Sequence, residues 1–125
     1  MFKKIKEFFR VLGELKYIIP LLRYKFPDPD DNESLAHSFE KTVKQFGDNN
    51  FIFFEDENWS YSETNNAANS LANKLIEDGV SHSDRVVLFM ENRPDFIITI
   101  LALNKIGAIG VLINTSLKGK PLIHC

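Results

Sequence analysis

The side chains that could do acid–base or nucleophilic chemistry are few and widely spaced in this chain of 125 residues. The three histidines, His37, His82 and His124, have no nucleophile or orienting acid identifiable nearby in the sequence, and a catalytic histidine needs such partners within hydrogen-bond reach. We therefore expect a structural or neutral role for each. The single cysteine, Cys125, cannot form an internal disulfide, which fits a reducing compartment.

Two acidic clusters have the side chains that a hard cation prefers. Asp30 lies next to Asp31, and residues 55–57 read Glu-Asp-Glu. Carboxylate oxygens are the usual ligands of Ca²⁺ and Mg²⁺. Runs of like charge more often solvate a loop, and this is our interpretation of both clusters. The sequence predicts no metal site.

The glycines do not form a phosphate-binding motif. Gly119-Lys120 lacks a glycine five residues earlier and is followed by Pro121, where a phosphate loop has Ser or Thr. Gly107 and Gly110 follow a helical pattern, whereas a dinucleotide-binding fingerprint follows a strand. The sequences His-Glu-x-x-His and Gly-x-Ser-x-Gly are also absent from the chain. We therefore predict no catalytic and no cofactor-binding residue.

Charge divides the chain into a basic start and an acidic remainder. Residues 1–26 hold seven basic and two acidic residues, a net charge of +5, whereas the rest of the chain carries −7. Apolar residues recur every three or four positions from Phe2 to Phe26, which predicts one apolar stripe along a helix. Pro20 should kink or break this helix near Ile19, because proline lacks an amide proton and clashes with the preceding turn.

A basic helix with bulky apolar side chains suits the headgroup region of a membrane. We predict that this segment associates with an anionic membrane surface without spanning the bilayer, because its charges interrupt every apolar run. The alternative is a helix packed on the rest of its own protein. The residues predicted to meet the membrane surface are Lys3, Lys4, Lys6, Arg10, Phe2, Phe8 and Phe9.

After an acidic, proline-containing linker at residues 27–34, the pattern is that of an α/β domain over residues 35–125. Ser34 can cap a helix running to about Phe46. The remaining predicted elements are a hairpin with strands at 51–54 and 59–61, a helix from Ser60 to Gly79 with apolar positions Ala68, Leu71, Ala72, Leu75 and Ile76, a buried strand at 85–90, a helix at 94–106 and a second buried strand at 108–113.

This order of elements predicts a mainly parallel sheet with crossover helices. We expect the sheet to be incomplete, since two βα units leave its edges uncovered and another helix begins near Pro121. A membrane span at residues 96–113 is the competing interpretation, with Lys105 as its only charge. Gly107 and Gly110 fall in the middle of that stretch, so a helix, a glycine stop and a strand explain it better.

The segment from Phe51 to Cys125 resembles the start of the AMP-forming acyl-CoA synthetases, and in particular the branch of fatty acid transport proteins and very-long-chain acyl-CoA synthetases. The residues that carry this resemblance are Trp59-Ser60-Tyr61-Ser62-Glu63, Ala68, Asn69, Ala72, Asp84-Arg85-Val86, Glu91-Asn92-Arg93-Pro94-Asp95-Phe96, Lys105-Ile106-Gly107-Ala108 and Leu112-Ile113-Asn114-Thr115-Ser116-Leu117-Lys118-Gly119-Lys120-Pro121-Leu122-Ile123-His124-Cys125. Two positions depart from the family pattern: Thr64 stands where Leu is common and Ser83 where Gly is common. We expect both to be peripheral.

The resemblance implies the N-terminal part of the large domain of an adenylate-forming enzyme. For a complete protein it implies a long- or very-long-chain fatty acid–CoA ligase that uses ATP, Mg²⁺ and coenzyme A. The fatty carboxylate attacks the α-phosphate of ATP to give acyl-AMP and pyrophosphate, and coenzyme A then displaces AMP. The family's ATP-phosphate loop, its adenine and ribose contacts and its catalytic lysine correspond to no residue of this sequence. The resemblance therefore implies that this chain supplies scaffold, binds no cofactor and is inactive alone.

A lipid-facing start suits an enzyme whose substrate partitions into membranes, so we expect a peripheral protein on the cytoplasmic face of a membrane. The alternative function is a membrane-associated α/β binding module without catalysis. Nucleic acid is not an expected partner, because the body of the chain is acidic and its aromatic residues do not alternate with basic ones.

Overall fold

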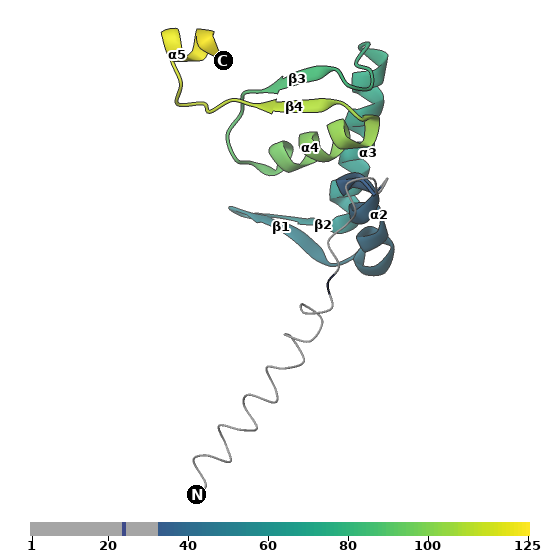
Figure 1. Ribbon diagram of the computed structural model, residues 1–125. Helices are drawn as coiled ribbons and strands as arrows, with labels where there is room; N and C mark the ends of the chain where they lie inside the picture. The colour runs from purple at the N-terminus through teal and green to yellow at the C-terminus, as the bar shows by residue number, and fades with distance from the viewer. Residues whose placement is uncertain (1–23, 25–32) are drawn as a thin grey trace, which may run out of the picture. The chain divides into compact units, whose positions relative to one another are not determined.

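The computed structural model describes Tyr24 and residues 33–125, and the chain divides into two units, Met1–Asn32 and Glu33–Cys125. Apart from Tyr24, the predicted basic helix at 1–26 and most of the linker lie outside the described residues. The second unit contains helices and strands in the following order (Figure 1). They are α2 (Leu35–Phe46), β1 (Asn50–Phe54), β2 (Glu57–Ser60), α3 (Tyr61–Glu77), β3 (Arg85–Leu88), α4 (Pro94–Ile106), β4 (Ile109–Leu112) and α5 (Lys120–His124).

Helix α2 begins and ends as predicted, and Gly47 follows its last residue. The Ser34 hydroxyl accepts a hydrogen bond from the His37 amide at 3.1 Å. Gly47 has φ −50°, which any residue can adopt. A Cβ at this position would lie 2.5 Å from the Ser62 hydroxyl oxygen and 2.9 Å from the Val43 carbonyl oxygen. A side chain here would therefore crowd both the Val43 carbonyl of α2 itself and the Ser62 side chain of α3.

Strands β1 and β2 form the predicted antiparallel hairpin, which makes a two-stranded sheet of its own. Phe54 pairs with Glu57, so the turn consists of Glu55 and Asp56 alone. The predicted turn, which extended to Asn58, was too long. The chain reverses in two residues because Glu55 adopts a left-handed conformation, with φ 51°.

Helix α3 begins with the predicted capping box. The Ser60 hydroxyl accepts from the Glu63 amide at 3.1 Å, and the Glu63 carboxylate accepts from the Ser60 amide at 2.8 Å. Thr64, expected to be peripheral, is instead fully buried, and its hydroxyl donates to the Ser60 carbonyl at 2.8 Å. That bond satisfies the polar atom that threonine brings to this buried position.

The core lies where α2, α3 and α4 meet, around Phe39, Ala68, Ile98 and Leu101. The small Ala68 has no exposed surface, which lets α3 and α4 approach closely. Ile76 was predicted to face this core, but it is 55% exposed. It borders an open hollow between the helices instead of the packed centre.

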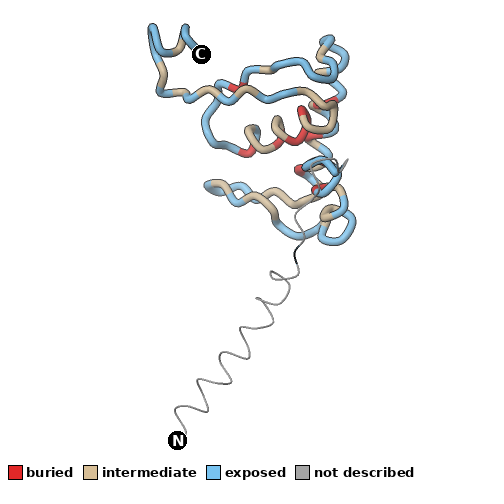
Figure 2. Tube along the Cα trace, viewed as in Figure 1, coloured by how far each residue is buried: buried red, intermediate tan, exposed pale blue. Residues whose placement is uncertain are grey.

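Strands β3 and β4 are parallel and paired from Arg85 with Ile109 to Leu88 with Leu112, with α4 as the crossover helix between them. The parallel pairing confirms the predicted fold class. Both strands are shorter than predicted, and they are not buried on both faces. Leu88 is 2% exposed, but Val87 is 58% exposed. Helix α4 packs on one face, and no other described element lies over the opposite one (Figures 1 and 2).

The stretch 96–113 is a helix, a stop and a strand, as expected. Gly107 ends α4 with φ 70°, a left-handed conformation that glycine adopts without steric cost. Within residues 33–125 and Tyr24, no helix combines the length and the apolar character needed to cross a bilayer.

Candidate functional site

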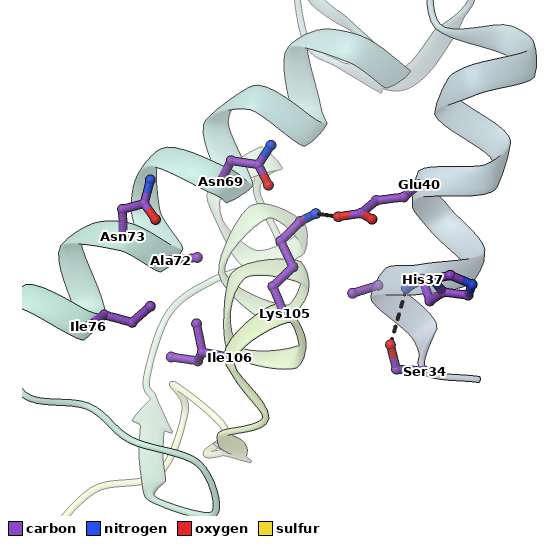
Figure 3. Close-up of a pocket in the computed structure, with 10 residues that line it drawn as sticks. Ser34, His37, Glu40, Asn69, Ala72, Asn73, Ile76, Lys105 and Ile106 are labelled. Atoms are coloured by element: carbon purple, nitrogen blue, oxygen red, sulfur yellow. Dashed lines mark hydrogen bonds and ion pairs between the residues drawn. The ribbon is translucent and has the colours of Figure 1, made fainter. Parts of the chain in front are cut away.

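A polar hollow of about 570 Å³ lies between α2, α3 and α4. Figure 3 shows His37 and Glu40 on α2, Asn69 and Asn73 on α3, and Lys105 reaching across from α4. The three helices pack part of their surfaces on the shared core around Phe39 and Ala68. Their polar residues beside this core line the hollow.

The charged centre of the hollow is an ion pair. The Lys105 ammonium donates a hydrogen bond to the Glu40 carboxylate (Figure 3). The lysine side chain is 10% exposed and the glutamate side chain 45%. The hydrogen bond from Lys105 is the main cause that lowers the pKa of Glu40 below its ordinary value. Glu40 is therefore held as a carboxylate by its partner, which makes it a poor general base.

The residue before this lysine also joins α4 to α2. The Asn104 side-chain oxygen accepts from the Ala36 amide at 2.7 Å. The first amides of a helix have no partner within the helix. The Ser34 hydroxyl, directly before the helix, accepts from the His37 amide. The Asn104 side chain, 68 residues further along the chain than Ala36, accepts from the Ala36 amide. Both polar residues at the end of α4 thus hold α2 in place, which is a structural role.

A second hollow, of about 510 Å³, lies at the carboxyl ends of β3 and β4. Open parallel sheets bind their ligands at this edge. Polar Glu91, Asn92 and Thr115 and apolar Phe96 line it. The Asn114 side chain, also in the lining, accepts a hydrogen bond from the Ser116 amide at 2.8 Å. Such a lining can form hydrogen bonds and apolar contacts, but it pairs no nucleophile with a base.

An apolar hollow of about 360 Å³ adjoins it where the hairpin meets the start of α4. Asn92 and Phe96 line both hollows. The Arg93 guanidinium lies over the Phe54 ring, 5.6 Å from its centroid, and this cation–π contact ties the hairpin to α4.

The three histidines, which the sequence presents as possible acid–base groups, do not lie together in the structure. His37 and His124 are exposed, and the His82 ring lies beside Gly107 with its Nδ1 2.8 Å from the Ser83 hydroxyl. In the described part of the chain, no three His, Cys, Asp or Glu side chains gather as metal ligands. The predicted membrane-surface residues Lys3, Lys4, Lys6, Arg10, Phe2, Phe8 and Phe9 lie outside the described residues.

Sequence reasoning missed the polar contacts between α2 and α4. Their one local signal is that Asn104 and Lys105 end the apolar run at residues 100–103 of α4. Nothing in the sequence pairs them with Ala36 and Glu40, because the contacts span 68 and 65 residues.

Residues 39–125 match the AMP-binding enzyme family. The chain is 31% identical over 96 residues to the medium/long-chain-fatty-acid–CoA ligase FadD6 of Mycobacterium tuberculosis, covering 77% of this chain and 16% of that protein. It is 34% identical over 90 residues to a very long-chain fatty acid transport protein of Cochliobolus heterostrophus, covering 71% of this chain and 14% of that protein.

Among solved structures, the chain is similar to the N-terminal subdomain of Klebsiella oxytoca NpsA in complex with anthranilyl-AMSN. The TM-score is 0.71 with 25% sequence identity, over 74% of this chain and 24% of the other. The chain spans about a sixth or less of the length of the curated relatives named above. The fold, with its parallel β3–β4 pair, and the sequence both match these proteins. The chain therefore belongs to the AMP-binding enzyme family.

Proposed function

We propose that this chain forms N-terminal scaffold of a fatty acid–CoA ligase that acts on long or very long acyl chains. The observation that carries the proposal is the match over residues 39–125 to the AMP-binding family, with a fatty acid–CoA ligase and a fatty acid transport protein among the relatives. The complete protein would convert a fatty acid, ATP and coenzyme A to acyl-CoA, AMP and pyrophosphate.

We propose that the described residues do not bind Mg-ATP, and two observations support this. A polyphosphate needs cationic donors, and transfer at its α-phosphate needs a metal ion held by carboxylates or similar ligands. Lys105, the lysine in the hollow between α2, α3 and α4, is already paired with Glu40. The described part of the chain gathers no cluster of metal ligands. We therefore propose that this chain alone is inactive and that its contribution is to position the rest of the enzyme.

We propose further that residues 1–26, which lie outside the described residues, attach the protein peripherally to the cytoplasmic face of a membrane, and that 27–34 is a linker to the domain at 35–125. The net charge of +5 and the apolar stripe support this proposal. So does the acyl chain of the proposed substrate, which partitions into lipid. The basic residues would hold the enzyme where its substrate is concentrated.

A hybrid enzyme tests the ligase proposal. The full 125-residue chain is fused ahead of the part of FadD6 that follows its matched segment of 96 residues. We expect the hybrid to form acyl-CoA from long-chain fatty acids in the presence of Mg-ATP and coenzyme A, and the 125-residue chain alone to form none. A folded hybrid without activity, together with an isolated chain that unfolds cooperatively, would favour a non-catalytic binding module.

A further inference from the structure

The apolar hollow between the hairpin and the start of α4 has the size and the walls of a site for a small molecule. Its volume is about 360 Å³. Sites for small ligands enclose roughly 300–1,000 Å³ and are mostly apolar, with a few polar groups that fix the ligand. The free end of the hairpin forms one side and the start of α4 the other (Figure 1). The apolar residues that line the hollow are Ile52, Phe54, Pro94, Phe96 and Ile97.

Two polar side chains complete the lining. They are Asn92 and Arg93, and Arg93 is the one charged residue among the described residues that line this hollow. Its guanidinium lies over the Phe54 ring, 5.6 Å from the ring centroid. A cation–π contact uses the charge of the guanidinium and leaves its N–H groups free to donate. The charge is therefore held beside an apolar space with its hydrogen-bonding groups available.

The Arg93 guanidinium has no strong partner for those groups. Within Tyr24 and residues 33–125 it makes no hydrogen bond, and its one ion pair is with Asp95, whose carboxylate oxygen lies 4.0 Å from Nε. That distance is too long for a hydrogen bond, and the two side chains are 58% and 73% exposed, so water screens the pair. The planar fork of a guanidinium matches a carboxylate through two parallel hydrogen bonds. Arg93 can therefore accept a further carboxylate.

We propose that this hollow binds a carboxylate with one apolar chain, the chemistry of a fatty acid. The chain would pack on Ile52, Phe54 and Ile97. The carboxylate would accept hydrogen bonds from Arg93 and Asn92. This site goes beyond the proposed function, because its lining pairs no nucleophile with a base and would hold a fatty acid without activating it. The substrate of the proposed function has the same chemistry, so such a ligand is at hand where the complete protein would act.

Other occupants satisfy the hollow less well. An apolar side chain from another stretch of polypeptide would fill the space but leave Arg93 without an anionic partner. An amphiphile with a cationic head would meet the like charge of Arg93. A phospholipid brings two acyl chains, and a hollow of about 360 Å³ is near the lower limit for small ligands. One apolar chain with one carboxylate satisfies both the walls and the arginine.

Titration of decanoate into the 125-residue chain, below the concentration at which decanoate forms micelles, tests the site. The methyl signals of Ile52 and Ile97 in NMR spectra locate the ligand, and we expect both to shift until the site is saturated. Arg93→Gln should weaken decanoate binding by about tenfold or more, because it removes a charge-assisted bidentate contact. Arg85→Gln is the matched control. Arg85 is exposed on β3 and does not line the hollow, so this variant should keep the affinity unchanged.

Two further comparisons separate the charge from the hollow. Decanol has the same chain without the carboxylate, so we expect it to bind more weakly than decanoate, and equally to Arg93→Gln and to the unsubstituted chain. Arg93→Lys keeps a cation near the Phe54 ring but loses the planar fork, and should weaken decanoate binding by a smaller factor than Arg93→Gln. If Arg93→Gln does not fold, the comparison of Arg93→Lys with Arg85→Lys takes its place.

Equal affinities of the Arg93 variant and the unsubstituted chain for decanoate would overturn the inference. So would decanol, or decyltrimethylammonium, that binds as tightly as decanoate. In the folded FadD6 hybrid the methyl signals of Ile52 and Ile97 should shift as well, and their failure to shift would show that the added polypeptide fills the hollow, which also overturns the inference. These signals report binding and not ligase activity. A folded hybrid that binds decanoate in the hollow but forms no acyl-CoA would reject the proposed function and leave the site standing.

Discussion

The side-chain oxygen of Asn104, in the last turn of α4, accepts a hydrogen bond from the backbone amide of Ala36, in the first turn of α2, at 2.7 Å. Ala36 is 4% exposed, so water cannot readily replace this acceptor. Asn104 therefore completes the N-terminal cap of α2, a helix that lies far before it in the sequence.

Replacing Asn104 with Ala should destabilise the chain. The Ala36 amide would be left buried without its partner, which costs about 1–3 kcal/mol of unfolding free energy. The measurement is urea unfolding followed by circular dichroism. Asn73→Ala is the matched control, because Asn73 is exposed on α3 and should change stability by less than about 0.5 kcal/mol. Equal stabilities of the two variants would show that the cap contributes nothing.

The Lys105–Glu40 pair predicts a loss of stability in acid. Because the hydrogen bond from Lys105 lowers the folded-state pKa of Glu40, the folded chain keeps this carboxylate charged where the unfolded chain takes up a proton. The stabilisation is fully present above the unfolded pKa of about 4.3 and disappears as the pH falls through the lower folded value.

The variant Glu40→Gln should therefore lose less stability than the unsubstituted chain between about pH 5 and about pH 3. Urea midpoints across this range measure the difference. Glu55→Gln removes the same charge from the hairpin turn, away from the pair, and should retain the acid sensitivity. An identical pH profile for Glu40→Gln and the unsubstituted chain would exclude a contribution from the ion pair.

Ser83 precedes β3 in a left-handed conformation, with φ 68°. This conformation costs a residue with a Cβ roughly 1–2 kcal/mol. Ser83→Gly should raise the unfolding free energy by about 0.5–1 kcal/mol, since the greater freedom of glycine in the unfolded chain offsets part of the gain.

Ser81→Gly is the control of opposite sign. Ser81 does not have a positive φ, so glycine there adds freedom to the unfolded chain and also removes the hydroxyl that donates to the Gly79 carbonyl at 3.5 Å; both effects should destabilise. The melting temperatures of both variants, compared with that of the unsubstituted chain, measure the two effects. A Ser83→Gly variant that melts below the unsubstituted chain would show that the Ser83 contact with His82 outweighs the strain.

The local features of this fold could be predicted from the sequence because their determinants lie within a few residues. Ser60 and Glu63 form their capping box across one turn, and Pro94 and Gly107 mark the two ends of α4. The parallel order of β3 and β4 followed from the helix between them. The family resemblance rested on the same local segments.

The remaining features depend on contacts that no local pattern encodes. The burial of Thr64 is set by its place beneath the packed helices, and the exposure of Ile76 by a hollow between α2 and α3. Apolar Val87 reads as a core residue in any sequence pattern, yet whether it is covered depends on what packs on the sheet. Such outcomes require the three-dimensional arrangement.

The basic residues at the start of the chain should control binding to membranes. Replacing Lys3, Lys4, Lys6 and Arg10 with Gln removes four charges, each worth about 1 kcal/mol at an anionic surface. We expect sedimentation with phosphatidylserine-containing vesicles to fall strongly and to become insensitive to salt. The control replaces four basic residues of the second unit, Lys41, Lys44, Lys74 and Lys118. Sedimentation of the first variant equal to that of the control would contradict membrane attachment through this segment.

Fatty-acid-dependent exchange of pyrophosphate into ATP by the FadD6 hybrid tests the central claim most directly, because exchange reports the adenylation step before coenzyme A takes part. If this chain is scaffold of a fatty acid–CoA ligase, the folded hybrid should catalyse exchange with a long-chain fatty acid, and the 125-residue chain alone should catalyse none. A hybrid that folds cooperatively but shows no exchange with fatty acids of any length, or an isolated chain that catalyses exchange by itself, would contradict the account.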